Sequence, residues 1–320
     1  MTVANFIIAG TEKAGTTSVY SYLAQHPQVA ASRRKETNFF RSETFRGGAE
    51  ALSRYAACFP DAPGVPVVME ASPGYLGEAE LVVPRMRALV PHAKLLFILR
   101  EPVSRFLSSY HFHRAKLNLP AELTFSDYFE ACLAYAGSAD GDEPRGDIGE
   151  WFLKVLPFGC YSRYLRHYFE AFPRRQISVT FYDDLQADPR AFMERLSGFL
   201  DIDVSCWANA DFEPVNVTFS GRSRLLHRLA VLANDRLEPV LRPRPRLKSA
   251  VVRGYKWLNR ARDGYDGMGA EERALLESFY APWNRDLEAV LGRPLPPGWA
   301  GGEGTREADW RTQRGRMAAP

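Results

Sequence analysis

The stretch NFIIAGTEKAGTT, residues 5–17, decides the fold of this chain. Its apolar half predicts a buried strand, and TTSVYSYLAQH, residues 16–26, has the pattern of a helix that ends before Pro27. A glycine-containing turn between strand and helix directs backbone N–H groups and a helix N-terminus at one point, which suits an anion. The sequence therefore predicts a phosphate-binding loop. The alternative is a tight turn capped by threonine.

The lysine of this loop stands in an unusual place. The common phosphate-binding loop reads G-x-x-x-x-G-K-[ST], with lysine directly after the second glycine. Here Gly10 and Gly15 keep the glycine spacing, Thr16 occupies the lysine position, and Lys13 precedes Gly15 by two residues. A lysine inside the loop can reach over a bound phosphate toward its outer, reacting side.

Strands and helices alternate along the rest of the chain. Further strands are expected over 67–71, 94–100 and 176–182, and helices over 78–91, 101–116, 124–136, 161–173, 188–202 and, as one or two helices, 270–292. This alternation predicts an α/β fold with a parallel sheet. We expect one domain over residues 1–300 and a flexible tail over 301–320, where the sequence lacks periodicity.

Two other stretches carry candidate functional residues. In LLFILREPVSRFLSSY, Arg100 ends a strand and Ser108 follows eight residues later on the next helix. Ligands of open α/β sheets bind at this end of the strands, although Arg100 could also be a surface ion-pair residue. In SRRKETNFF, Glu36 stands among cations before two phenylalanines and could be a general base. Locally, a solvated charge run is the favoured interpretation.

Together these stretches resemble the sulfotransferases that use 3′-phosphoadenosine 5′-phosphosulfate (PAPS), most closely the branch of heparan sulfate sulfotransferases and their bacterial relatives. The matching motifs are KAGTTSVYSYLAQHP, KETNFF and LREPVSRFLSS, in the family's order and spacing. MEASPGYL resembles the family's E-K-T-P-x-Y segment, and NVTFSGRSRLLHRL resembles its glycine–basic cofactor loop more loosely. The resemblance covers roughly residues 4–235 and the ending FYAPWNRDLEAVLGRPLPPGW.

The resemblance implies a three-layer α/β/α fold like that of P-loop NTPases, with PAPS as sulfuryl donor and no metal. It implies that Lys13 stabilises the bridging oxygen of the leaving group and that Glu36 deprotonates an acceptor hydroxyl, with His111 and His113 as reserve bases. The implied donor-binding residues are Lys13, Ala14, Gly15, Thr16, Thr17, Ser18, Arg100, Ser108, Gly221 and Arg222, and the implied acceptor-binding residues are Lys35, Ser72, Tyr75 and His111.

One departure from the family pattern concerns the acceptor. The heparan-type segment has lysine before T-P, whereas Ala71 precedes Ser72 and Pro73 here. The lost cation weakens the case for a highly anionic glycosaminoglycan. A carbohydrate, lipid or secondary-metabolite hydroxyl is the expected acceptor.

Two other functions remain open at this point. A P-loop kinase or NTPase would need a magnesium-binding aspartate, for which Asp183 or Asp184 could serve, although either could simply cap the next helix. A non-catalytic module could use the basic 242–262 stretch, which would also allow peripheral contact with an anionic membrane, or that stretch could be a solvated loop.

Charge, cysteine spacing and apolar runs indicate the partners and the location to expect for the protein. The formal net charge of +3 does not by itself indicate nucleic-acid binding, and we expect none. The four cysteines are widely spaced and lack a CxxC pair, so we read them as ordinary buried thiols. With no apolar run near the ~20 residues of a membrane span, we expect no transmembrane segment and a cytoplasmic location.

Overall fold

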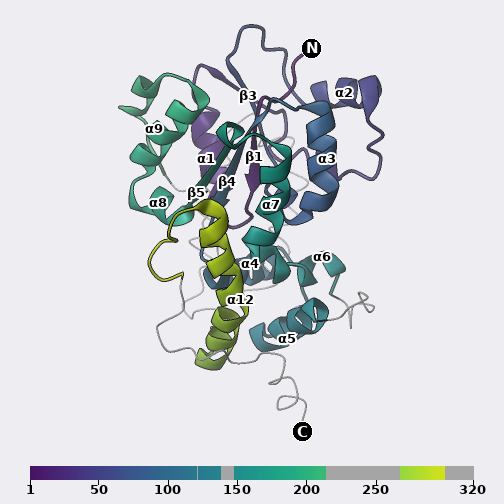
Figure 1. Ribbon diagram of the computed structural model, residues 1–320, viewed down its shortest axis with the longest axis vertical. Coiled ribbons are helices and arrows are strands. Elements are labelled where there is room, and N and C mark those ends of the chain that lie inside the picture. The colour runs from purple at the N-terminus through teal and green to yellow at the C-terminus, as the bar shows by residue number, and fades with distance from the viewer. Residues whose placement is uncertain (121, 138–147, 214–266, 300–320) are drawn as a thin grey trace, which may run out of the picture.

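The computed structural model describes residues 1–120, 122–137, 148–213 and 267–299 of the chain. In these residues five parallel strands form one sheet in the order β2-β3-β1-β4-β5 (Figure 1). The strands are β1 (Phe6–Gly10), β2 (Val29–Ala31), β3 (Val67–Ala71), β4 (Lys94–Leu99) and β5 (Ile177–Phe181). The predicted parallel α/β sheet is confirmed, with β1 at its centre.

Helices cover both faces of the sheet. On one face lie α1 (Thr16–Leu23), α8 (Tyr182–Ala187) and α9 (Pro189–Leu200), and on the other lie α3 (Ala79–Leu89) and α7 (Tyr161–Ala171) (Figure 1). Because side chains alternate along a strand, Phe6 and Ile8 pack on the first side and Ile7 and Ala9 on the second. The expected three-layer architecture is therefore confirmed.

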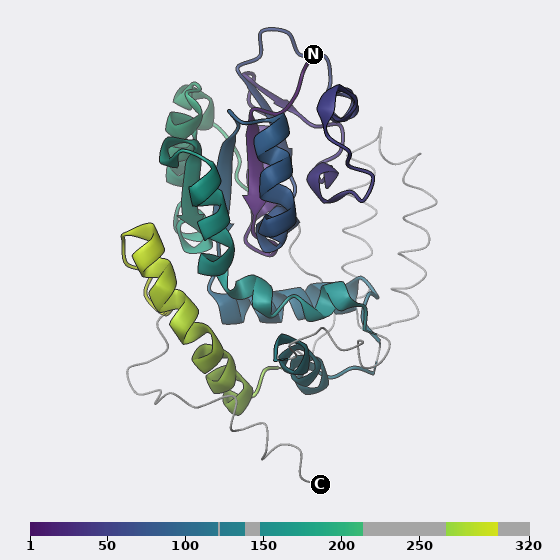
Figure 2. The same ribbon diagram turned by 45° about the vertical axis from the view of Figure 1, so that its right-hand side comes forward.

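A third group of helices lies beyond the carboxyl ends of the strands (Figure 2). It comprises α4 (Pro102–Ala115), α5 (Phe125–Ala136), α6 (Glu150–Leu153) and α12 (Ala270–Leu291), while α2 (Gly48–Ala56) lies beside α3. Phe106 of α4 stacks on Tyr128 of α5 at a ring separation of 5.5 Å, within their common hydrophobic cluster. This layer fixes α4 against the edge of the sheet where the glycine-containing loop lies.

Two details differ from the sequence expectation or refine it. The short strand β2 was not predicted, because three residues carry too little pattern to be recognised. The C-terminal segment is one continuous helix, although Pro282 lies inside it. Proline removes one helical hydrogen bond, but Leu276, Tyr280 and Leu287 on either side are buried, and this packing offsets the loss.

Candidate active site

The loop between β1 and α1 is built on left-handed backbone positions. Lys13 has a φ of 67° and Gly15 a φ of 78°. A Cβ atom added to Gly15 would lie 2.6 Å from Leu185 Cδ2 and 3.0 Å from Tyr182 Cε2, so only glycine fits. The first turn of α1 then starts at Thr16, and such a turn has N–H groups with no partner inside the helix. The structure thus confirms the predicted order of strand, tight turn and helix, and anion binding at this turn stays a prediction.

Arg100 braces this loop directly. Its Nη1 donates to the carbonyl oxygen of Lys13 at 2.9 Å, and its guanidinium lies 4.9 Å from the Tyr182 ring. Tyr161 donates its hydroxyl to the Arg100 carbonyl oxygen at 2.7 Å, which fixes the end of β4. The structure therefore brings together two cationic residues, Lys13 and Arg100, that are far apart in the sequence.

Lys13 is half-buried, and its ammonium group lies against α4. Its Nζ lies 3.8 Å from the centre of the Phe112 ring, a residue of α4. Burial, and then the charge of Arg100, lowers the pKa of Lys13 to about 8. Two neighbouring cations in a partly buried place repel one another, and a bound anion would relieve this repulsion.

Four of the other predicted donor-site residues belong to this loop or to the first turn of α1. Ala14, Thr16 and Ser18 are buried and Thr17 is half-buried. Ser108 is half-buried on α4, two turns of helix beyond Arg100. Gly221 and Arg222 lie outside the described residues, as do the basic 242–262 stretch and the 301–320 tail.

Glu36 lies in residues 35–41, which we call the base segment after the role that the sequence predicts for Glu36. Its carboxylate is 2.7 Å from Lys35 Nζ, and 47% of its side chain is exposed. The loop residue Glu12 has a raised pKa, caused first by burial and then by the charge of Glu36. Glu12 also feels the charges of Arg41 and Lys13. The charge of Glu36 therefore acts on the loop that carries Lys13.

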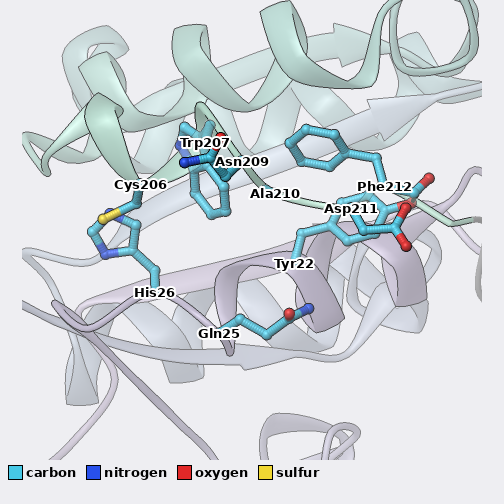
Figure 3. A pocket seen from close by; sticks show the side chains of 9 residues that line it. All are labelled: Tyr22, Gln25, His26, Cys206, Trp207, Asn209, Ala210, Asp211 and Phe212. Carbon is cyan, nitrogen blue, oxygen red and sulfur yellow. Dashed lines mark hydrogen bonds between the residues drawn. The ribbon is translucent and has the colours of Figure 1, made fainter.

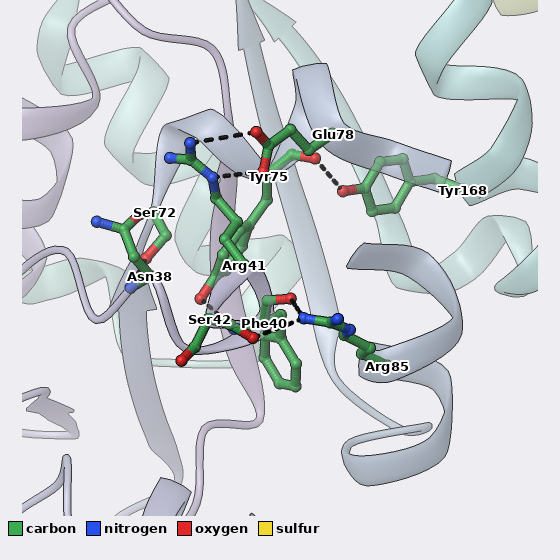
Figure 4. A network of polar contacts seen from close by, with 9 residues as sticks. All are labelled: Asn38, Phe40, Arg41, Ser42, Ser72, Tyr75, Glu78, Arg85 and Tyr168. Atoms are coloured by element: carbon green, nitrogen blue, oxygen red, sulfur yellow. Dashed lines mark hydrogen bonds and ion pairs between the residues drawn. The ribbon is translucent and has the colours of Figure 1, made fainter. Parts of the chain in front are cut away.

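Ser72 and Tyr75, which the sequence assigned to the acceptor, are fully buried. Ser72 Oγ donates to Glu70 Oε2 at 3.0 Å and accepts from the Asn38 N–H at 3.1 Å. Tyr75 Oη donates to Glu70 Oε1 at 3.4 Å and accepts from the Phe40 N–H at 3.3 Å. Figure 4 shows both residues beside the base segment. Their hydroxyls hold that segment from within the protein, so we assign them a supporting role.

The two reserve histidines differ in environment. His111 is half-buried, one turn beyond Ser108. His113 is 6% exposed, its ring lies 4.9 Å from that of Phe152, and its Nε2 has no hydrogen-bond partner among the described residues. Burial, and then the charge of Lys13, lowers the pKa of His113 to about 4. A histidine with this pKa is neutral at neutral pH and is a weak base.

Several residues of the site escaped the sequence analysis. Glu12 is next to Lys13 in the quoted loop, and Phe112 lies between the two histidines that were considered. Glu70 interrupts the apolar strand VVMEA, a signal that sequence inspection could have used. Tyr182 packs against both Gly15 and Arg100, and nothing in the sequence indicates this contact.

Other features of the described residues do not compete with this site. A cavity of about 200 Å³ lies near the C-terminal end of α1, lined by Tyr22, His26 and Trp207 among others, and contains none of the predicted residues (Figure 3). Asp183 and Asp184 are exposed in the first turn of α8, but Phe181 occupies the N-cap position and no side chain caps this helix, so neither aspartate is the cap that the sequence analysis allowed. Within the described ranges, no helix is long and apolar enough to cross a membrane, and no three acidic, histidine or cysteine side chains cluster as metal ligands would.

Comparison with known proteins identifies the chain's relatives. The family model "Sulfotransferase domain" matches residues 4–220. The membrane-associated sulfotransferase kil1 of Dictyostelium discoideum is 26% identical over 280 residues, covering 67% of this chain and 59% of its own length. Human bifunctional heparan sulfate N-deacetylase/N-sulfotransferase 2 is 28% identical over 202 residues, covering 62% of this chain and 22% of its own length. The matches therefore span only part of these curated relatives.

A solved structure shares the fold. The crystal structure of a sulfotransferase from Alicyclobacillus acidocaldarius matches with a TM-score of 0.62 and 22% sequence identity. The match covers 93% of this chain and 99% of that one. It supports the α/β architecture described above.

Proposed function

The chain belongs to the sulfotransferase domain family, and from this premise we propose that it moves the sulfuryl group of PAPS to an acceptor hydroxyl. The observation that carries the proposal is the joining of Lys13 and Arg100 across the sheet edge by a 2.9 Å hydrogen bond. Lys13 comes from the loop motif and Arg100 from the strand-end motif. Two cations from separate motifs suit PAPS, which carries one phosphate at its 5′ position and another at its 3′ position.

On the donor side, the residues present fit the nucleotide. Gly15 and the start of α1 form the anion-binding turn, and Lys13 has the depressed pKa of a buried cation beside another cation. We assign Ala14, Gly15, Thr16, Thr17 and Ser18 to the 5′-phosphate, and Arg100 and Ser108 to the 3′-phosphate. Gly221 and Arg222 would complete this half of the site.

Lys13 is proposed to stabilise the oxygen that leaves with the nucleotide. Negative charge grows on that oxygen as the sulfuryl group departs, and a preplaced cation in a partly desolvated site stabilises it strongly. The contact with Phe112 holds the ammonium group in place.

On the acceptor side, Glu36 is proposed as the general base. Its exposed carboxylate can reach an acceptor, and Lys35 Nζ at 2.7 Å holds one of its oxygens in place. Lys35 and His111 are proposed to contact the acceptor. We prefer Glu36 to His113, because 47% of the Glu36 side chain is exposed and open to an acceptor, whereas His113 is 6% exposed.

The acceptor is proposed to be a carbohydrate, lipid or secondary-metabolite hydroxyl of low negative charge. Ala71, which replaces the lysine of the heparan-type motif, is fully buried and offers no charge. The carboxylate of Glu36 also lies on this side of the site, where it is paired with Lys35. Some relatives are heparan sulfate N-sulfotransferases by name, so amino sugars belong in the test as well.

The test is turnover of ³⁵S-labelled PAPS against a panel containing octyl glucoside, glucosamine, a long-chain alcohol, 4-nitrophenol and N-desulfated heparan. We expect label on a hydroxyl acceptor, without added metal, and far less label with Lys13→Ala. Preference for N-desulfated heparan would overturn the acceptor class alone. Magnesium-dependent hydrolysis of ATP, with no transfer from PAPS, would overturn the proposed reaction in favour of a P-loop NTPase.

A further inference from the structure

A buried carboxylate lies behind the base segment. Glu70, in β3, is 0% exposed and accepts hydrogen bonds from four hydroxyl groups. Its Oε1 accepts from Tyr55 at 2.7 Å and from Tyr75 at 3.4 Å, and its Oε2 accepts from Ser72 at 3.0 Å and from Thr37 at short range. No lysine, arginine or histidine among the described residues pairs with it. Neutral donors alone therefore satisfy this carboxylate.

These contacts converge on the residues around Glu36. Thr37 follows Glu36 directly and bonds to Glu70, and the Asn38 N–H bonds to Ser72 Oγ at 3.1 Å. On the other side of Glu36, the Lys35 carbonyl oxygen accepts from the Ala71 N–H at 3.2 Å. Glu36 is thus fixed at both of its neighbours while its own side chain remains exposed.

More distant contacts stiffen the far end of the base segment (Figure 4). Arg41 Nε lies 2.6 Å from Glu78 Oε2, and Arg85 Nη1 donates to the Phe40 and Ser42 carbonyl oxygens at 2.9 Å. These bonds hold residues 40–42. The bonds nearest to Glu36 are those that lead to Glu70.

A charge at this position is costly for the fold. Burial raises the pKa of Glu70, and the four hydroxyl donors oppose that rise. A buried carboxylate without a cation is expensive, and apolar packing would serve stability at least as well. The carboxylate orients these segments instead, because its two oxygens can accept hydrogen bonds from hydroxyl groups of several segments at one point.

We propose that Glu70 is a positioning residue for sulfuryl transfer: it holds Thr37, and through Ser72 also Asn38, so that the adjoining Glu36 faces the acceptor. This inference rests on the proposed role of Glu36 as base. Glu70 touches neither donor nor acceptor, so its loss acts on the chemical step and leaves nucleotide binding intact.

The decisive variant is Thr37→Val, which removes the hydroxyl nearest to Glu36 and keeps the side-chain shape. We expect kcat to fall about 10–100-fold, because small displacements of a catalytic group have effects of this size. The KM for PAPS and the Kd for 3′,5′-ADP should stay unchanged, and Thr37→Ser should restore kcat. Glu70→Gln should show the same split, and Thr37→Val keeps the test valid if Glu70→Gln does not fold.

The control is Ser197→Ala. Ser197 is fully buried in α9 and accepts from Trp207 Nε1 at 2.7 Å, so this variant also loses one buried hydrogen bond, but away from the site. It should lower Tm as Thr37→Val does and leave kcat unchanged. Hydrogen exchange gives a readout that needs no acceptor: amides of residues 36–40 should exchange faster in Thr37→Val and not in Ser197→Ala.

A double variant separates this inference from the proposed base. If Glu70 acts through Glu36, Thr37→Val should cost little in a Glu36→Gln background. Turnover is followed as 3′,5′-ADP release with each acceptor of the panel and with water alone. An unaffected Glu36→Gln would overturn the base itself. An impaired Glu36→Gln with an unaffected Thr37→Val, or with multiplicative losses in the double variant, would overturn only the positioning role.

Discussion

The proposed donor half and the proposed acceptor half of the site are held together by different means. In the donor half, residues 10–18 and Arg100 are held by backbone geometry: a left-handed Gly15, the start of α1, and a guanidinium on the Lys13 carbonyl oxygen. In the acceptor half, the base segment is held by side chains that meet at the buried Glu70. A backbone-built half suits a ligand that does not vary, and a side-chain-built half can change its acceptor by substitution without disturbing the donor.

The largest effect should come from Glu36→Gln, in the acceptor half. Glutamine keeps the shape of glutamate and cannot take a proton, so kcat should fall by about 10²–10⁴, the usual contribution of general-base catalysis. Binding of 3′,5′-ADP, measured by calorimetry, should not change. Glu43→Gln, at an exposed position just after the base segment, is the matched control and should retain full activity.

A contrary result would shift the base to α4. The assay should use an alcohol acceptor, because a phenol loses its proton without much help. If Glu36→Gln keeps nearly full turnover and His111→Ala or His113→Ala is inactive, the base is a histidine. The base segment would then shape the acceptor site without taking part in proton transfer.

Lys13→Ala should have the next largest effect, and it tests the donor half. Removing one preorganised charge-stabilising group typically costs about 10²–10³ in kcat. The Kd for 3′,5′-ADP should change much less, because the turn at Gly15 and Arg100 remain. A normal kcat with a raised KM for PAPS would mean that Lys13 only binds the donor. Lys13 would then have the same role as the turn that carries it.

The same contrast explains what could be predicted from sequence. The loop, Arg100 and the strand–helix order are local signals, and the structure confirms the fold that they imply. The Glu70 cluster joins Ser72 and Tyr75, which follow Glu70 closely in sequence, to Thr37 and Tyr55 from two other segments, so its existence depends on tertiary packing. Sequence patterns therefore located Ser72 and Tyr75 but did not show that their side chains point into the protein. The short strand β2 was not predicted because three residues carry too little pattern. Tyr182 was not predicted because its partners, Gly15 and Arg100, are far from it in the sequence.

Arg100→Ala should sharpen the division within the donor half. A hydrogen bond to a charged group contributes about 1.5–3 kcal/mol, so the affinity for 3′,5′-ADP should fall roughly 10–100-fold. The affinity for AMP, which lacks the 3′-phosphate, should fall much less. Arg100→Lys is the control, because it keeps the charge and loses the fork of donors. Equal weakening of both nucleotides would mean that Arg100 serves only to brace the Lys13 carbonyl oxygen.

The smallest effect expected is a pH dependence of the donor half. Lys13 has a pKa lowered to about 8, chiefly by burial and then by Arg100, and only its protonated form carries the charge that attracts the donor. Protonation is lost as pH rises, so kcat/KM for PAPS, which reports the free enzyme, should be level below pH 8 and fall above it. Between pH 7 and pH 9 the fall should be about tenfold, given one proton and a tenfold change per pH unit beyond the pKa. The value of kcat should fall less, because a bound anion raises the pKa of a neighbouring lysine.

Lys13→Arg provides the control, since a guanidinium stays charged throughout this range. Whatever its absolute activity, this variant should lose the decline in kcat/KM above pH 8. A decline that persists in Lys13→Arg would assign the titration to another group and would separate the depressed pKa of Lys13 from donor binding.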